Sequence, residues 1–295
     1  MLTTLQRVAA FTGLCVLACA QAWAARELSD ELGRHVTLPD DPQRVVCLTP
    51  SLTETVYALG QGSVVVGVTD FTDDPPEAKS KPSVGGLTDA SLEKIVSLHP
   101  DLVLAMGTLN REETVDELEH VGIPVFVVDP HGLDGIAASI QHVGDALNRS
   151  SDAGKLLRRL EQQRAAVAGR VAGLARPKVL VVIWYDPVIT AGKQSFITDV
   201  LAAAGAQSVT ADIDQAWPQI SLEEVLRRAP DFVLLVRQAH GGISREDLEA
   251  HAGWDRLKAV QDNRIISVSD RLFHPSPAVF DALQQLAKEI HPEAF

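Results

Sequence analysis

The sequence predicts an α/β protein with two similar lobes, each with a mainly parallel sheet, joined by one long linker helix. Two stretches of fourteen residues nearly repeat each other: Ser91–Leu104 (SLEKIVSLHPDLVL) and Ser221–Leu234 (SLEEVLRRAPDFVL). Each is typical of a helix that begins at Ser and ends before Pro-Asp, followed by a buried strand, because proline cannot continue a helix. Two distant copies of one unit indicate two lobes with a ligand cleft between them. The alternative is a chance match of a common α/β connection, which the matching Ser and Glu disfavour.

The N-terminal residues 1–24 are typical of a secretory signal peptide. Arg7 is the only charge before Arg26, and Ala22-Trp23-Ala24 provides a small-x-small cleavage site, so we expect cleavage after Ala24. The apolar run is shorter than the ~20 residues that a membrane-spanning helix needs. An alternative is lipoprotein processing at Cys19. We therefore expect a periplasmic protein that contacts the membrane only through a partner or a lipid on Cys19.

Composition and cysteine usage exclude some classes of function. The formal net charge of −13 argues against nucleic acid as a partner. Cys15 and Cys19 lie in the predicted signal, which leaves Cys47 alone in the mature chain and excludes an intramolecular disulfide. Cys47 stands in a strand-like run, so we expect a buried apolar residue rather than a nucleophile.

The first lobe is expected over residues 25–148 and begins with a hairpin over 28–38. Ser51 and Glu54 fit a capping box at the start of the next helix. Alternating strands and helices indicate a parallel sheet with helices on its faces. We expect further strands over 45–48, 64–68, 102–105 and 125–128, and a helix over 111–121.

The linker is expected over residues 149–176. Its segment Ser151–Leu174 has no proline and carries apolar residues at helical spacing, which predicts one helix of ~35 Å at ~1.5 Å per residue. One stiff helix between the lobes permits only a small movement. The second lobe is expected over 177–295, with strands over 178–184, 232–236 and 264–268 and helices over 197–204, 221–228 (capped by Ser221 with Glu224) and 277–290.

Local motifs of enzymes are missing. The sequence has no G-x-S-x-G, no P-loop and no H-E-x-x-H, and its histidines do not pair at metal-ligand spacing within one element. We predict no catalytic residues, no bound metal and no cofactor. A hydrolase or metal-dependent enzyme on a two-lobed scaffold remains the alternative from another class, because catalytic groups can come from distant segments.

An ordered set of segments resembles the periplasmic binding proteins for vitamin B12, ferric siderophores and haem. It begins with RVVCLTPSLTE at Arg44–Glu54 and extends through both repeated units to Ser269-Asp270; its other parts are 67–76, 190–193 and 216–220. The pattern is nearest to the cobalamin-binding members. The resemblance implies a monomeric solute-binding protein, not an enzyme, that captures a corrinoid and delivers it to an ABC import permease dimer.

The resemblance also implies permease-docking residues. In this family the Glu of each repeated unit lies on top of its lobe and pairs with an Arg of the permease, and these positions match Glu93 and Glu223 here. Two similar lobes would then meet the two subunits of a permease. The alternative is that a Glu near a helix N-terminus only interacts favourably with the helix dipole.

A further set of positions matches the family's ligand-binding segments, with Tyr185 added because it follows a predicted strand. Cobalamin needs broad aromatic contact with polar groups at the rim. Leu87 and Met106 stand where the cobalamin-binding protein has tryptophans, which leaves a related corrinoid, a ferric siderophore or haem as alternatives. His274 is also a candidate ligand for cobalt or haem iron. The predicted ligand-binding residues are Phe71, Tyr185, Trp217, Asp270, Arg271, Leu272, Phe273 and His274.

Overall fold

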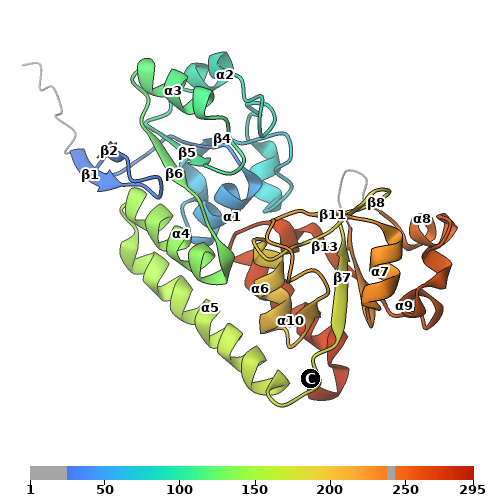
Figure 1. Cartoon of the computed structure of the whole chain (residues 1–295). Helices are drawn as coiled ribbons and strands as arrows, with labels where there is room; N and C mark the ends of the chain where they lie inside the picture. The colour runs from blue at the N-terminus through green and yellow to red at the C-terminus, as the bar shows by residue number, and fades with distance from the viewer. Residues whose placement is uncertain (1–24, 238–242) are drawn as a thin grey trace, which may run out of the picture.

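The computed structural model describes residues 25–237 and 243–295 and shows two α/β lobes connected by a long helix (Figure 1). Each lobe has a four-stranded, all-parallel sheet, in the orders β4-β3-β5-β6 and β10-β7-β12-β13. The predicted fold class is therefore confirmed. The predicted signal peptide and Cys19 lie outside the described residues. Within the part that is described, no helix is both long and apolar enough to cross a membrane.

The N-lobe carries the first sheet and begins with a hairpin. The hairpin strands are β1 (Ala25–Ser29) and β2 (His35–Pro39), as predicted. Because all strands of the sheet are parallel, their carboxyl ends lie along one edge. The remaining elements are β3 (Val45–Cys47), α1 (Pro50–Ala58), η1 (Gly62–Val64), β4 (Val65–Gly67), η2 (Pro76–Ser80), α2 (Leu92–Ser97), β5 (Leu102–Met106), α3 (Glu112–His120), β6 (Val125–Val128) and α4 (Gly132–Ala146).

Helix α1 begins earlier than predicted, and the expected capping box of Ser51 with Glu54 is wrong. Thr49 is the N-cap, and its hydroxyl accepts a hydrogen bond from the Leu52 backbone N–H at 3.3 Å. Pro50 occupies the first helical position, where its missing N–H costs nothing. Glu54 therefore lies one turn inside the helix, only 8% exposed, where its side chain is available for a different partner.

Helix α5 (Ser150–Val171) connects the lobes and confirms the predicted long helix, with its end three residues earlier. The chain leaves the helix at Ala172, which is extended, and Gly173 adopts a positive φ of 78°. Buried residues along α5 include Leu156, Leu160 and Val167, and the helix packs on α4 of the N-lobe and on helix α10 (Ala278–Ile290) of the C-lobe. One helix is thus fixed to both lobes.

The C-lobe carries the second parallel sheet and a small antiparallel sheet that was not predicted. The expected strand over 178–184 ends at Val182, and the chain continues into the small sheet, order β11-β9-β8. The remaining elements are β7 (Lys178–Val182), β8 (Trp184–Tyr185), β9 (Val188–Ile189), α6 (Phe196–Ala203), β10 (Gln207–Ser208), β11 (Gln219–Ile220), α7 (Leu222–Arg228), β12 (Phe232–Arg237), α8 (Arg245–Ala250), η3 (Trp254–Arg256), α9 (Lys258–Gln261), β13 (Ile265–Ser269), η4 (Asp270–Phe273) and η5 (Pro292–Ala294).

The serines of the two repeated units are helix caps in both lobes. The Ser91 hydroxyl accepts a hydrogen bond from the Lys94 backbone N–H at 3.3 Å, and the Ser221 hydroxyl accepts one from the Glu224 N–H at 3.2 Å. The predicted cap at Ser221 is confirmed, but the Glu224 side chain does not complete a capping box. It binds two arginines instead, as described below.

The Pro-Asp aspartates of the two units are also equivalent. The Asp101 carboxylate accepts a hydrogen bond from the backbone N–H of Arg44, just before β3, at 2.9 Å. The Asp231 carboxylate accepts one from the N–H of Lys178, the first residue of β7, at 2.8 Å. Each aspartate thus connects the end of its repeated helix to the first strand of the parallel sheet in the same lobe.

Cys47 lies in β3 and has no exposed surface. Burial disfavours the thiolate and raises the pKa of the Cys47 thiol to about 12, although the Thr53 hydroxyl opposes the shift. The predicted role of a small apolar core residue is confirmed.

Candidate functional site

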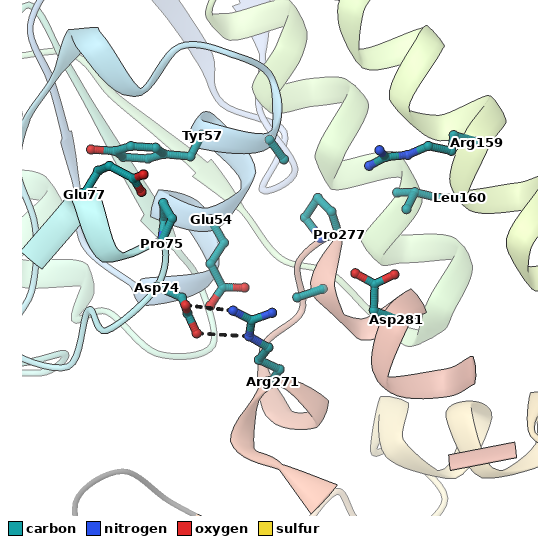
Figure 2. A pocket seen from close by; sticks show the side chains of 12 residues that line it. Glu54, Tyr57, Asp74, Pro75, Glu77, Arg159, Leu160, Arg271, Pro277 and Asp281 are labelled. Atoms are coloured by element: carbon teal, nitrogen blue, oxygen red, sulfur yellow. Dashed lines mark hydrogen bonds and ion pairs between the residues drawn. The ribbon is translucent and has the colours of Figure 1, made fainter. Parts of the chain in front are cut away.

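The carboxyl edges of the two parallel sheets face each other across the interface of the lobes. The segment with Phe71 and Asp74 follows β4 in the N-lobe, and η4 follows β13 in the C-lobe. The Arg271 guanidinium of η4 lies 2.7 Å from the Asp74 carboxylate (Figure 2). Ligands of open parallel sheets bind beyond the carboxyl ends of the strands. The facing edges therefore form the candidate ligand site.

Two predicted ligand-binding aromatics are unusually exposed for their type. Phe71 is 49% exposed and Trp217 is 45% exposed, so neither is a core residue. The rings of Trp217 and Phe273 lie with their centroids 5.8 Å apart. The structure therefore brings together two predicted residues separated by more than fifty positions, one from a loop and one from η4.

The segment Asp270–His274 has mixed roles. Leu272 is completely buried in the hydrophobic core, so its predicted role as a ligand contact is corrected to packing. The Asp270 carboxylate accepts a hydrogen bond from the Ser269 hydroxyl at 3.0 Å. A single turn of helix must place some side chains outward and one inward, and Leu272 points into the core.

His274 is bound to the N-lobe rather than left open in a cleft. Its Nδ1 lies 2.5 Å from Oε1 of Glu54. Burial favours the neutral ring, but the hydrogen bond and charge of Glu54, with Asp270 and Asp74, outweigh burial and raise the pKa of His274. Only a neutral imidazole binds a metal. This arrangement favours an ion pair over metal ligation at His274. Among the described residues no three His, Cys, Asp or Glu side chains are grouped to hold a metal ion.

Tyr185 lies in a different place from the one predicted. It pairs with Val188 across the small sheet, and this row of side chains faces the second core cluster of the C-lobe, so the expectation that Tyr185 faces the interlobe cleft is corrected. The Tyr185 ring contacts the His251 ring edge-on at 4.5 Å and lines a cavity of about 610 Å³ that only C-lobe residues surround. The preceding residue, Trp184, belongs to the opposite face and is 47% exposed.

The predicted docking glutamates are the residues of the repeat that lack a structural role. In each unit the Ser caps the helix and the Asp binds the first sheet strand, as shown above. Glu93 and Glu223 are both exposed, and neither has a side-chain hydrogen bond or ion pair among the described residues. Helix-dipole stabilisation does not require the same residue at the same place in both lobes.

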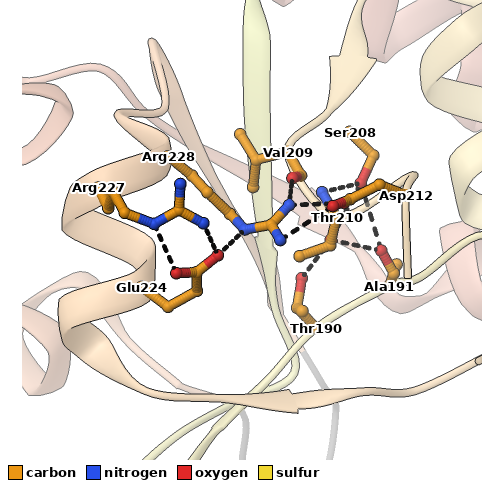
Figure 3. A network of polar contacts seen from close by, with 9 residues as sticks. All are labelled: Thr190, Ala191, Ser208, Val209, Thr210, Asp212, Glu224, Arg227 and Arg228. Carbon is orange, nitrogen blue, oxygen red and sulfur yellow. Dashed lines mark hydrogen bonds and ion pairs between the residues drawn. The ribbon is translucent and has the colours of Figure 1, made fainter.

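Helix α7, which presents Glu223, is held by a network that the sequence did not reveal (Figure 3). The Arg228 guanidinium donates to the Asp212 carboxylate at 2.5 Å, the Val209 carbonyl at 2.5 Å and the Glu224 carboxylate at 2.6 Å. Arg227 donates a second set of bonds to Glu224. Hydrogen bonds from the two arginines lower the pKa of Glu224 to about 2. Helix α7 is thus tied to the loop after β10.

A cavity of about 480 Å³ lies in the seam between the lobes (Figure 2). Its walls come from α1, the loop after β4 and η2 in the N-lobe, from α5, and from η4 and the start of α10 in the C-lobe. The ion pair of Arg271 with Asp74 stands at its wall, and so does Glu54. Sequence reasoning missed both acidic residues; their place within the segments that resemble the family was the only available signal.

Comparison with known proteins identifies similar chains. Residues 45–272 match the family model described as "Periplasmic binding protein". The vitamin B12-binding protein of Salmonella choleraesuis (strain SC-B67) is 32% identical over 248 residues, 84% of this chain and 90% of that protein. The haem-binding protein RhuT from Roseiflexus sp. RS-1 is 28% identical with a TM-score of 0.77, over 86% of this chain and 99% of that one. The Fe3+-hydroxamate transport protein from Saccharomonospora viridis is 25% identical with a TM-score of 0.73, over 90% and 98%.

Proposed function

This chain belongs to the periplasmic binding protein family, and from that premise we propose that it captures a corrinoid between its lobes and delivers it to an ABC import permease. It is a solute-binding transport protein of the vitamin B12, haem and siderophore type, and not an enzyme. We further propose that residues 1–24 are removed on export to the periplasm.

The exposed aromatic surface at the facing sheet edges is the observation that carries the corrinoid proposal. Phe71 comes from the N-lobe, and the pair Trp217 with Phe273 comes from the C-lobe. Half-exposed aromatic rings such as those of Phe71 and Trp217 suit a large ligand with apolar faces. Asp270, beside the aromatic pair in η4, adds a hydrogen-bond acceptor for the amide groups at a corrin rim.

The charge at this edge also favours a neutral ligand. An anionic siderophore needs free cationic groups, but the guanidinium of Arg271 is already paired with Asp74. Relatives named vitamin B12-binding protein support the same ligand class. Haem and ferric hydroxamates remain second candidates because structures named for those ligands share the fold at 25–28% identity.

A titration of the purified mature chain tests the ligand. Dicyanocobinamide, cyanocobalamin, haem and a ferric hydroxamate are titrated separately, with calorimetry and absorbance as readouts. We expect saturable binding of a corrinoid at micromolar concentration or below and weaker binding of the others. Binding of haem or the hydroxamate with no binding of either corrinoid would refute the corrinoid assignment.

We also propose that Glu93 and Glu223 dock the two lobes onto the two subunits of the permease. The support is their exposure together with their matched positions in the two repeated units. The hydrogen bonds of Arg228 would then keep α7 in position when the permease binds. Charge reversal tests this role and is described in the Discussion.

A further inference from the structure

We propose that Glu54 is a positioning residue, which from the N-lobe fixes the ligand-facing segment Asp270–His274 of the C-lobe. The proposal rests on the proposed function, because that function places the ligand at this segment. The Glu54 side chain hydrogen-bonds to His274 and Ser276, and it acts on the ligand site through these two C-lobe residues.

The two carboxylate oxygens of Glu54 bind two different groups of the other lobe. Oε1 accepts a hydrogen bond from Nδ1 of His274 at 2.5 Å, and Oε2 accepts one from the Ser276 hydroxyl at 2.5 Å. Glu54 is 8% exposed and Ser276 is completely buried. Charge-assisted hydrogen bonds of this kind are short and geometrically specific. A single buried carboxylate therefore fixes two residues that lie more than two hundred positions further along the chain.

Helix α1, which carries Glu54, is rigidly packed. Residues 50–56 of α1 are all buried, so the helix has no freedom to follow a moving partner. On the C-lobe side, the Ser276 hydroxyl also accepts a hydrogen bond from the Ala278 N–H at 3.2 Å, at the start of α10. The Glu54 contact thus joins the beginning of α10 directly to the N-lobe.

A second contact between the lobes fixes the other end of the same segment. Arg271 pairs with Asp74 at 2.7 Å, while Leu272 is packed in the core. Between these anchors stand Asp270 and Phe273, and the Phe273 ring supports Trp217. Without the contact at His274 the turn is held only by Arg271 and Leu272, and we expect the aromatic pair to shift relative to Phe71.

Stability alone is a weak reason for this arrangement. Apolar residues at such an interface stabilise as well as or better than a buried ion pair. A buried carboxylate instead specifies one geometry, because any displacement leaves it with unmet hydrogen bonds. Removing the hydrogen-bonding partners of metal-binding residues typically changes affinity by about 10- to 100-fold, and we expect an effect of that size here.

The pH dependence of affinity separates positioning from general stabilisation. The groups that face His274 are Glu54 from α1, Asp74 from the loop after β4, and Asp270 and Arg271 from η4; Asp281 of α10 acts on Arg271. Because these surroundings raise the pKa of His274 above its ordinary value of 6.5, the charged pair is complete below that value. It is lost as the pH rises through the raised pKa. We expect ligand affinity to fall over that range.

The experiment compares Glu54→Gln and Glu54→Ala with Glu77→Gln, a matched control. Glu77 is an N-lobe Glu that lines the same seam cavity, and among the described residues its side chain forms no hydrogen bond or ion pair with the C-lobe. Dicyanocobinamide affinity is measured from pH 5 to 9, and amide hydrogen exchange of residues 269–276 is measured without ligand. We expect affinity about 10- to 100-fold weaker for Glu54→Ala, a flattened pH profile for Glu54→Gln, faster exchange in both, and no change in Glu77→Gln.

Every outcome of this experiment either supports or refutes the positioning role of Glu54. If Glu54→Gln is folded and matches wild type in affinity at every pH and in exchange, the positioning role is wrong. If Glu54→Ala fails to fold, Glu54→Gln, which keeps the shape of the side chain, carries the test. If the wild-type chain binds no corrinoid, the proposed function fails, and the ligand-free exchange alone decides whether Glu54 fixes the segment.

Discussion

Replacing Trp217 with Ala should weaken corrinoid binding about 100-fold. A tryptophan side chain offers at most ~250 Å² of surface, and Trp217 is 45% exposed. About 110 Å² is thus open to a ligand, and at ~25 cal/mol per Å² its loss costs about 2.8 kcal/mol of binding free energy. This is the range of a binding hot spot, and each ~1.4 kcal/mol is tenfold in Kd.

The assay is a calorimetric titration of dicyanocobinamide into wild type and into the variant, with circular dichroism to verify that both are folded. We expect a lower melting temperature, because the contact with Phe273 at 5.8 Å is lost, but a native spectrum. Val121→Ala is the control. Val121 is 53% exposed at the end of α3, beside the amino edge of the N-lobe sheet and away from the facing carboxyl edges. An affinity of Trp217→Ala within threefold of wild type, or an equal loss in Val121→Ala, would refute the reasoning.

Three further predictions concern docking, motion and helix α7. The double change Glu93→Lys with Glu223→Lys should abolish uptake and permease binding but leave ligand affinity unchanged, because truncating close interfacial charge pairs costs about 2–5 kcal/mol. The control is Glu117→Lys with Glu289→Lys, which carries the same change in charge. Normal uptake by the Glu93 and Glu223 double variant would exclude the docking role. Ligand should change the radius of gyration in small-angle X-ray scattering only slightly, because α5 and the contacts of Glu54 and Arg271 join the lobes; a large decrease on binding would show a hinge in α5. The pKa of Glu224 is lowered from 4.5 to about 2, so its pairing stabilises the fold above pH 4.5, and this stabilisation is lost as the pH falls from about 4.5 to about 2. The difference in melting temperature between wild type and Glu224→Gln should therefore shrink over that pH range. A difference in melting temperature that does not depend on pH would contradict this linkage.

Elements with a strong local pattern could be predicted from the sequence. Strand β6 lies at Val125–Val128, as predicted from the alternation of strands and helices, and α5 follows from apolar residues at helical spacing. The small antiparallel sheet could not be predicted, because strands of two residues such as β8 are too short for a period to show. Its pairing, set by tertiary contacts, turned Tyr185 towards the C-lobe core.

The candidate site also contains some residues that local sequence could predict and others that only tertiary contacts define. Phe71 and Trp217 stand in segments that contain prolines, which are typical of the surface, and both side chains are half-exposed. Nothing local distinguishes Glu54, because its partners His274 and Ser276 are brought to it only by the docking of the two lobes. A Glu three residues after a Ser at a helix start fits a cap equally well, so the sequence favoured the local explanation over the distant one.

The buried thiol of Cys47 makes this chain convenient for site-specific chemistry. It is the only cysteine among residues 25–295, and with a pKa of about 12 and no exposed surface it has almost no thiolate at neutral pH to react with maleimides or oxidants. A cysteine placed on the surface within this range would therefore be its single reactive thiol. A fluorophore attached next to Phe71 would test whether the ligand binds there, and one next to Glu93 would test whether the permease docks there, without any native cysteine having to be removed.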